Sequence, residues 1–83
     1  MYTIRITHQA KKDIEKLSPK LKDKLKDILI NLISKDPYVG KKLIGDLAGS
    51  YSLRLNIKDR IVYSIDQDMK MVYIERAKSH YGE

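Results

Sequence analysis

The chain has 83 residues and a formal net charge of +6, from 17 basic and 11 acidic side chains. This length corresponds to one small domain, and the positive balance favours an acidic partner such as nucleic acid, an acidic protein or an anionic surface. The absence of cysteine excludes disulfides and thiolate chemistry, and no apolar run reaches the roughly 18 residues that a bilayer-spanning helix needs. Because the first residues do not read as a signal peptide, we expect a soluble, cytoplasmic protein with no membrane partner.

A strand and a helix are expected first. Apolar side chains alternate with polar ones over residues 2–6, which predicts a strand with one buried face. Thr7 can then cap a helix over residues 8–17 with its hydroxyl group. Three apolar residues at helical spacing would give this helix one buried side: Ala10, Ile14 and Leu17.

A second helix is expected over residues 19–34. Ser18 suits the cap and Pro19 suits the first helical position, where the missing proline N–H costs nothing. The apolar side chains of this helix form one wide stripe: Leu21, Leu25, Ile28, Leu29, Leu32 and Ile33. Asp36-Pro37 ends the helix, because a residue before proline is disfavoured in the helical conformation. The remaining lysine-rich faces are typical of a solvated surface.

The connection over residues 35–49 holds three of the four glycines, together with Lys41 and Lys42. Loops carry function more often than cores do, but paired lysines are also common on ordinary surfaces. The sequence therefore leaves a role of these two lysines in binding open.

The rest of the chain predicts three strands separated by turns. Residues 51–55 alternate, residues 61–65 are apolar on both faces as in a central strand, and residues 71–77 form the last strand. Turn residues lie between the strands, at positions 56–59 and 66–68. The expected fold is α+β over a single domain, residues 1–83. An N-terminal strand and a two-helix hairpin pack on one face of a small, mainly antiparallel twisted sheet, in the order β-α-α-β-β-β.

Four cationic side chains fall on or beside the expected strands: Arg54, Arg60, Arg76 and Lys78. Antiparallel order places the start of one strand near the end of its neighbour, so several of these cations can converge. Converging cations bind phosphate, and arginine does so in bidentate geometry. The alternative is that each cation pairs with a nearby carboxylate (Asp59, Asp66 or Glu75) and has no further role.

A histidine–tyrosine pair, His80-Tyr81, follows the last expected strand. Histidine titrates at about pH 6.5 in model peptides, so it can give or take a proton under cell conditions. Two widely separated histidines without cysteine do not make the ligand spacing of a metal site, and no glycine-rich phosphate loop stands out. We therefore expect neither a metal nor another cofactor.

Three of these segments together resemble the RelE/ParE superfamily of toxins from bacterial and archaeal toxin–antitoxin pairs. The segments are Asp46-Leu47-Ala48-Gly49-Ser50-Tyr51-Ser52-Leu53-Arg54, Arg60-Ile61-Val62-Tyr63 and His80-Tyr81. The order of elements is also similar, so the resemblance covers nearly the whole chain. The terminal His-Tyr resembles the C-terminus of the RelE and YoeB branch. This resemblance implies an mRNA endonuclease that works in the ribosomal decoding site.

The resemblance also implies a reaction and roles for single residues. In such enzymes the ribose 2′-hydroxyl attacks the adjacent phosphate without a metal, which leaves a 2′,3′-cyclic phosphate and a 5′-hydroxyl end. Arg54 and Arg60 match the arginines that hold the scissile phosphate. His80 matches the proton-transferring histidine, and Tyr81 matches the tyrosine beside it.

Four further residues are candidates for binding RNA: Lys41, Lys42, Arg76 and Lys78. The partners that the resemblance implies are a cognate antitoxin, the ribosome and mRNA. Lys41 stands where YoeB-like members carry a glutamate, and Ile44 replaces a lysine of that branch. The nearest loop carboxylate, Asp46, falls where the branch carries no catalytic acid. The general base is therefore His80 or a lysine, and the identity of the acid stays open.

Two alternatives belong to other functional classes. ParE-type members share this fold but act by binding DNA gyrase, need no catalytic residues and lack the terminal His-Tyr. An inactive or purely RNA-binding relative is the second alternative.

Overall fold

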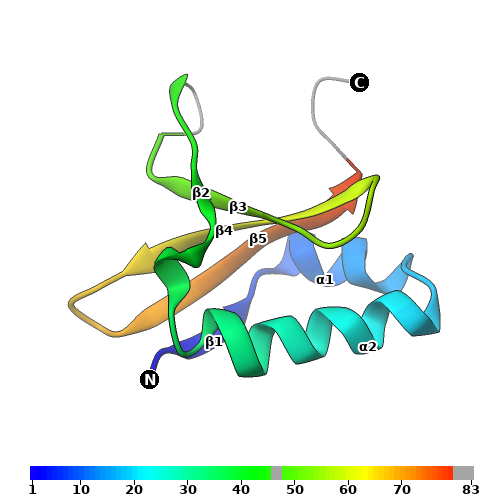
Figure 1. The fold of residues 1–83 in the computed structure, drawn as a ribbon, viewed down its shortest axis with the longest axis horizontal. Coiled ribbons are helices and arrows are strands. Elements are labelled where there is room, and N and C mark those ends of the chain that lie inside the picture. Colours follow the sequence, from blue (N-terminus) through cyan, green and yellow to red (C-terminus); the bar gives the residue numbers. More distant parts are fainter. Residues whose placement is uncertain (46–47, 80–83) are drawn as a thin grey trace.

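A mixed β-sheet forms one layer of the fold (Figure 1). The computed structural model describes residues 1–45 and 48–79, and within them the sheet has five strands in the spatial order β1-β5-β4-β3-β2. β1 runs parallel to β5, and the other neighbours are antiparallel. The strand bounds are Thr3–Ile6 for β1, Lys41–Lys42 for β2, Ser50–Arg54 for β3, Asp59–Asp66 for β4 and Met71–Ser79 for β5. The expected α+β fold, with a meander of strands and the N-terminal strand beside it, is confirmed.

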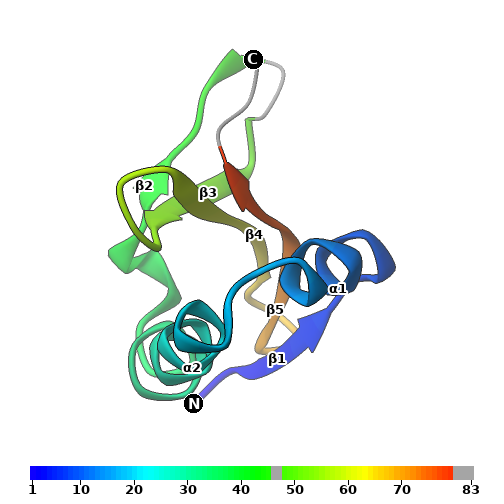
Figure 2. The same ribbon diagram turned by 90° about the vertical axis from the view of Figure 1, so that its right-hand side faces the viewer.

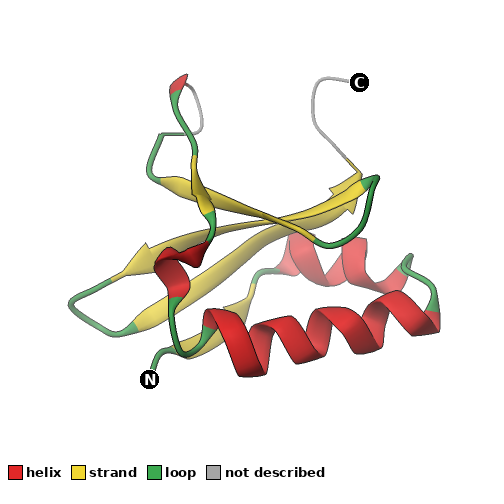
Figure 3. Cartoon of the chain, viewed as in Figure 1, coloured by secondary structure: helices red, strands yellow, loops and turns green. Residues whose placement is uncertain are grey.

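Two helices, α1 (His8–Glu15) and α2 (Pro19–Ile28), cover one face of the sheet (Figures 1 and 3). Thr7 Oγ1 accepts a hydrogen bond from the Ala10 N–H at 3.2 Å, and Ser18 Oγ accepts one from the Leu21 N–H at 3.3 Å. Both expected caps are thus confirmed. In Figure 1 both helices lie below the sheet, and among the described residues no α-helix lies above it. Figure 2, turned by 90°, shows α1 to the right of β5 and α2 to its lower left.

The ends of both helices differ from the expected ones. α1 stops at Glu15 because the Lys16 and Leu17 N–H groups donate to the Asp13 and Ile14 carbonyls, three residues back. α2 passes at Leu29 into a turn of π-helix, η1 (Leu29–Ile33), in which the Ser34 N–H donates to the Leu29 carbonyl five residues back at 3.0 Å. None of the described helices is long and apolar enough to cross a membrane.

The wider π-helical turn changes which side chains face the core. Ile33 is fully buried, but Leu32, which was expected in the buried stripe, is 38% exposed. The prediction for Leu32 was wrong because a π-helical turn takes more residues than an α-helical one, so the stripe changes phase. Ile6 is also 44% exposed, because β1 lies at the edge of the sheet.

The core lies between the helices and the covered face of the sheet. Its buried members come from α1, α2, η1 and the strands: Ala10, Leu25, Leu29, Ile33, Leu55, Ile61, Tyr63, Val72, Ile74 and Ala77. This arrangement confirms the expectation that the helix hairpin packs on the sheet, and it leaves the opposite face of the sheet without this helical cover.

Replacing Leu25 with alanine should lower the free energy of unfolding by about 2–5 kcal/mol, because the buried leucine would leave a cavity. A domain of this size has a total stability of about 4–12 kcal/mol, so the variant should be close to unfolded. Leu32→Ala, on the same helical segment but partly exposed, is the matched control and should cost far less. Circular dichroism melts that show equal midpoints for both variants would contradict this packing.

The connection after η1 contains two short elements that the sequence did not predict. A turn of 3₁₀-helix, η2 (Pro37–Val39), is followed by β2, which pairs with β3 through Lys41↔Ser52 and Lys42↔Tyr51. Two residues are too few to show strand alternation, so β2 left no signal in the pattern. Asp46, His80 and Tyr81 lie outside the described residues.

Candidate nucleic-acid interface

A row of three cations crosses the end of the sheet. Arg54 on β3 lies opposite Arg60 on β4, and Arg60 lies opposite Lys78 on β5. The neighbouring row, Leu53–Ile61–Ala77, belongs to the core side. Because successive side chains in a strand point to opposite faces, the cation row lies on the face without helices. The structure thus brings together three of the four cations that were expected to converge.

The row has no counter-ion among the described residues. Arg54 is exposed and Arg60 is half-buried, with its Nη1 donating to Ser52 Oγ at 3.5 Å. Neither these two arginines nor Lys78 forms an ion pair with a described carboxylate. Glu75, one of the carboxylates considered as a partner, instead accepts a hydrogen bond from Ser50 Oγ at 3.0 Å. Like charges placed directly opposite one another destabilise a sheet, so this arrangement is typical of a site that receives an anion.

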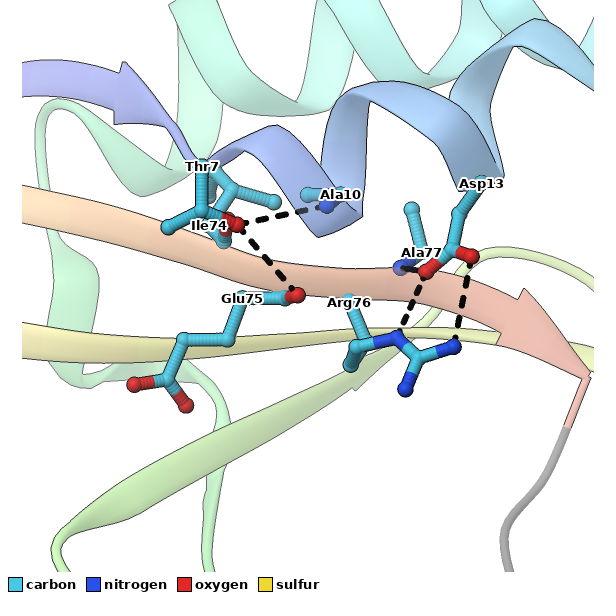
Figure 4. Close-up of polar contacts among 7 residues, drawn as sticks. All are labelled: Thr7, Ala10, Asp13, Ile74, Glu75, Arg76 and Ala77. Carbon is cyan, nitrogen blue, oxygen red and sulfur yellow. Dashed lines mark hydrogen bonds and ion pairs between the residues drawn. The ribbon is translucent and has the colours of Figure 1, made fainter.

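Arg76 has a partner that the sequence reasoning did not consider. Its Nε lies 2.8 Å from Asp13 Oδ2, and its Nη2 donates to Asp13 Oδ1 at 3.3 Å (Figure 4). Asp13 belongs to α1 and is only 6% exposed. The signal that was available is its position in α1, since residue 13 falls beside Ala10 and Ile14 on the buried side of the helix.

The carboxyl group of Asp13 is held in its ionised form. Burial alone would raise its pKa, but hydrogen bonds from the Arg76 side chain and the Ala77 N–H, together with the charges of Arg76 and Lys78, outweigh burial and lower the pKa below the ordinary value. Asp13 therefore neutralises Arg76 and leaves the cation row itself without a paired carboxylate.

The two lysines of β2 lie on different faces. Lys41 pairs with Ser52, which lies two residues from Arg54 on the same face as the cation row. Lys42 pairs with Tyr51, which packs against the core side. Both lysines are exposed, but only Lys41 lies on the face of the cation row, where it belongs to the next row, Lys41–Ser52–Val62–Arg76.

Tyr63, in the middle of β4, anchors the segment that leads to Lys41. Its hydroxyl donates to the Pro37 carbonyl at 2.7 Å and accepts a hydrogen bond from the Gly40 N–H at 3.1 Å. A Cβ at position 40 would come within 2.3 Å of this hydroxyl, so glycine is required for the close approach. The sequence indicated only that Tyr63 lies in a central strand, and it gave no sign of this anchor.

Tyr63→Phe should lower the free energy of unfolding by about 1–3 kcal/mol, because it removes both hydrogen bonds and leaves the Pro37 carbonyl without its donor. Burial raises the pKa of the Tyr63 hydroxyl to about 12. The stabilisation by the protonated Tyr63 hydroxyl is therefore complete below about pH 10, the pKa of tyrosine in the unfolded chain. It should be lost as the pH rises toward 12. Chemical denaturation between pH 8 and about 12 measures both effects.

Tyr73→Phe is the control, because among the described residues the Tyr73 hydroxyl makes a single hydrogen-bond contact, at 3.7 Å to Met71 Sδ. An alkaline loss of stability that persists unchanged in Tyr63→Phe would contradict the role of the buried phenol.

Comparisons with known proteins agree with this fold. The sequence matches the family described as ParE-like toxin of type II bacterial toxin-antitoxin system over residues 4–82. It is 36% identical to Toxin RelG from Mycobacterium tuberculosis (strain ATCC 25618 / H37Rv) over 76 aligned residues. The aligned region covers 90% of this chain and 86% of that protein.

Solved structures are also similar to the chain. The toxin–antitoxin complex RelBE2 from Mycobacterium tuberculosis contains a chain with a TM-score of 0.86 and 34% identity, covering 95% of this chain and 98% of that one. The YoeB–YefM complex from Staphylococcus aureus contains a chain with a TM-score of 0.79 and 27% identity, covering 98% of this chain and 99% of that one.

The fold and the family match together define a small bacterial toxin. The chain belongs to the ParE-like toxin family of type II toxin–antitoxin systems. The expected membership of the RelE/ParE superfamily is thereby confirmed, and the relatives of the RelE and YoeB types fit the expected branch.

Proposed function

We propose that this toxin is a ribosome-dependent mRNA endonuclease that inhibits translation. The observation that supports the proposal is the row Arg54–Arg60–Lys78 on the face without helices, which concentrates three positive charges with no ion-paired carboxylate among the described residues. A phosphodiester backbone supplies the anion that such a row fits.

In the proposed reaction the 2′-oxygen forms a bond to phosphorus while the bond from phosphorus to the 5′-oxygen breaks. The products are a 2′,3′-cyclic phosphate and a 5′-hydroxyl end. A base takes the proton of the 2′-hydroxyl, and an acid gives a proton to the departing 5′-oxygen. Arg54 and Arg60 hold the phosphate and stabilise the charge that develops on its oxygens, with Lys78 beside them.

His80 is the best candidate for proton transfer, with Tyr81 next to it. Lys41 lies on the same face as the cation row, but an ammonium group carries donors only and suits phosphate binding better than proton abstraction. Arg76 and Lys42 complete the set proposed to contact RNA. Arg76 lies on the face of the cation row, two residues from Lys78, with its guanidinium held by Asp13. Lys42 is exposed on the other face of the edge strand β2, so it would contact RNA only where the RNA passes around that edge.

Purified toxin added to ribosomes that carry a defined mRNA should cut within the codon in the decoding site and leave 5′-hydroxyl ends. The same mRNA without ribosomes should be cut far more slowly. A DNA gyrase supercoiling assay is the parallel arm. If the toxin inhibited gyrase and left the mRNA uncut, the result would contradict the proposal and favour the ParE-type function. If the toxin bound RNA but neither cut mRNA nor inhibited gyrase, it would be an inactive relative.

An antitoxin is the proposed protein partner, as in the RelBE2 and YoeB–YefM complexes of the relatives. We expect it to lay a complementary segment across the basic face and to cover Arg54 and His80. Adding the product of the neighbouring gene should abolish cleavage. Cleavage that continues at saturating amounts of that protein would refute this assignment.

A further inference from the structure

β5 loses its outer strand partner half-way along its length. β1 ends at Ile6, which lies opposite Ile74, so from Glu75 onward no described strand pairs with β5 on that side. Unpaired strand edges are free to shift register or to pair wrongly. The part of β5 that carries Lys78 is this unpaired part.

α1 takes the place of the missing strand (Figure 4). The Thr7 N–H and hydroxyl both donate to the Ile74 carbonyl, at 3.1 and 2.8 Å. Three residues further along β5, Asp13 Oδ2 accepts the Ala77 N–H at 3.1 Å. A carboxylate thus satisfies a strand amide that a neighbouring strand would otherwise bond, and the same carboxylate binds the guanidinium of Arg76.

The register of this segment decides which face Lys78 occupies. Tyr63 lies opposite Ile74 but Val62 lies opposite Arg76, so Glu75 is an extra residue that forms a β-bulge. Because side chains alternate, a slip of one residue would exchange the faces of Ala77 and Lys78. In the observed register Ala77 is fully buried in the core and Lys78 joins the cation row.

We propose that Asp13 is a positioning residue that fixes β5 in its register after the bulge and so holds Lys78 in line with Arg54 and Arg60. The inference rests on the proposed phosphate-binding function of that row. Asp13 acts from the edge of the sheet, through Ala77 and Arg76, and needs no contact with RNA. Its ionised state, favoured by Arg76 and Lys78, strengthens both hydrogen bonds to the strand.

A double-mutant cycle between Asp13→Asn and Lys78→Gln tests this link. Each single variant should lower kcat for cleavage of ribosome-bound mRNA by about 10–100-fold with little change in KM, because displacing a contact to the reacting group costs rate. If Asp13 acts through Lys78, the double variant should be no slower than Lys78→Gln alone. Asp23→Asn, an exposed charge on α2, is the matched control and should leave kcat unchanged.

Amide hydrogen exchange gives a second readout that needs no catalysis. The Ala77 amide should exchange at least about tenfold faster in Asp13→Asn than in the wild type, while the Ile61 amide in the paired centre of the sheet keeps its protection. Arg76→Lys keeps a positive charge beside Asp13 but loses the planar fork. It replaces Asp13→Asn in the exchange experiment if that variant does not fold, because this readout does not depend on contacts with RNA.

Additive losses of kcat in the cycle, or unchanged protection of Ala77, would overturn the positioning role. Wild-type toxin that never cuts mRNA would instead overturn the proposed function, and the exchange experiment would still decide whether Asp13 fixes the strand. The two failures are therefore distinguishable.

Discussion

His80→Ala should slow the cleavage of ribosome-bound mRNA by about 10²–10⁴-fold, which is the contribution expected from a positioned proton-transfer group. The fold should survive, because the described core draws its apolar side chains from the helices and strands. Affinity for the ribosome should also stay nearly unchanged, since the imidazole is proposed to move a proton rather than to hold the RNA.

Single-turnover cleavage from about pH 5 to 9 distinguishes the two roles that His80 could have. The wild-type rate should rise with pH through the imidazole range if His80 is the base, and should fall if it is the acid. His8→Ala, which removes the exposed histidine at the start of α1, is the control and should follow the wild-type profile. If His80→Ala cut at the wild-type rate throughout, the histidine would have no chemical role.

Arg54→Lys should reduce the cleavage rate by about 10²–10³-fold while RNA still binds. Lysine preserves the charge at the end of the cation row but loses the planar fork that matches two phosphate oxygens. Because Arg54 is exposed and makes no ion pair within the described residues, the substitution should have little effect on stability.

The rate is measured at saturating ribosomes, and RNA binding is measured separately at fixed ionic strength. Arg5→Lys is the matched control, because Arg5 is an exposed arginine on β1, at the opposite edge of the sheet from β2. A full rate in Arg54→Lys would show that a point charge is sufficient, and equal losses in both variants would indicate a general effect of arginine on the protein.

Local patterns predicted most of the fold. Thr7 and Ser18 cap the two helices as expected, and the apolar stripe and strand alternation place Leu25, Leu29 and Ile61 in the core. Leu32 could not be predicted, because nothing local distinguishes an α-helical turn from the π-helical turn of η1. β2 was missed because a strand of two residues exists only through its pairing with β3.

The candidate site was predictable in composition but not in geometry. The sequence named Arg54, Arg60 and Lys78, and strand register then placed them in one row. The pairing of Arg76 with Asp13 joins residues 63 positions apart in the chain, so no local pattern could show it. The β-bulge at Glu75 is equally invisible, since it depends on two strands at once.

Primer extension on a translated mRNA, after a brief pulse of toxin expression in bacterial cells, tests the central claim most directly. The account predicts new 5′ ends within codons of the translated region, absent from cells that express Arg54→Lys or His80→Ala at the same level. Intact mRNA in growth-arrested cells, with supercoiling of a reporter plasmid lost instead, would contradict the nuclease and establish gyrase as the target.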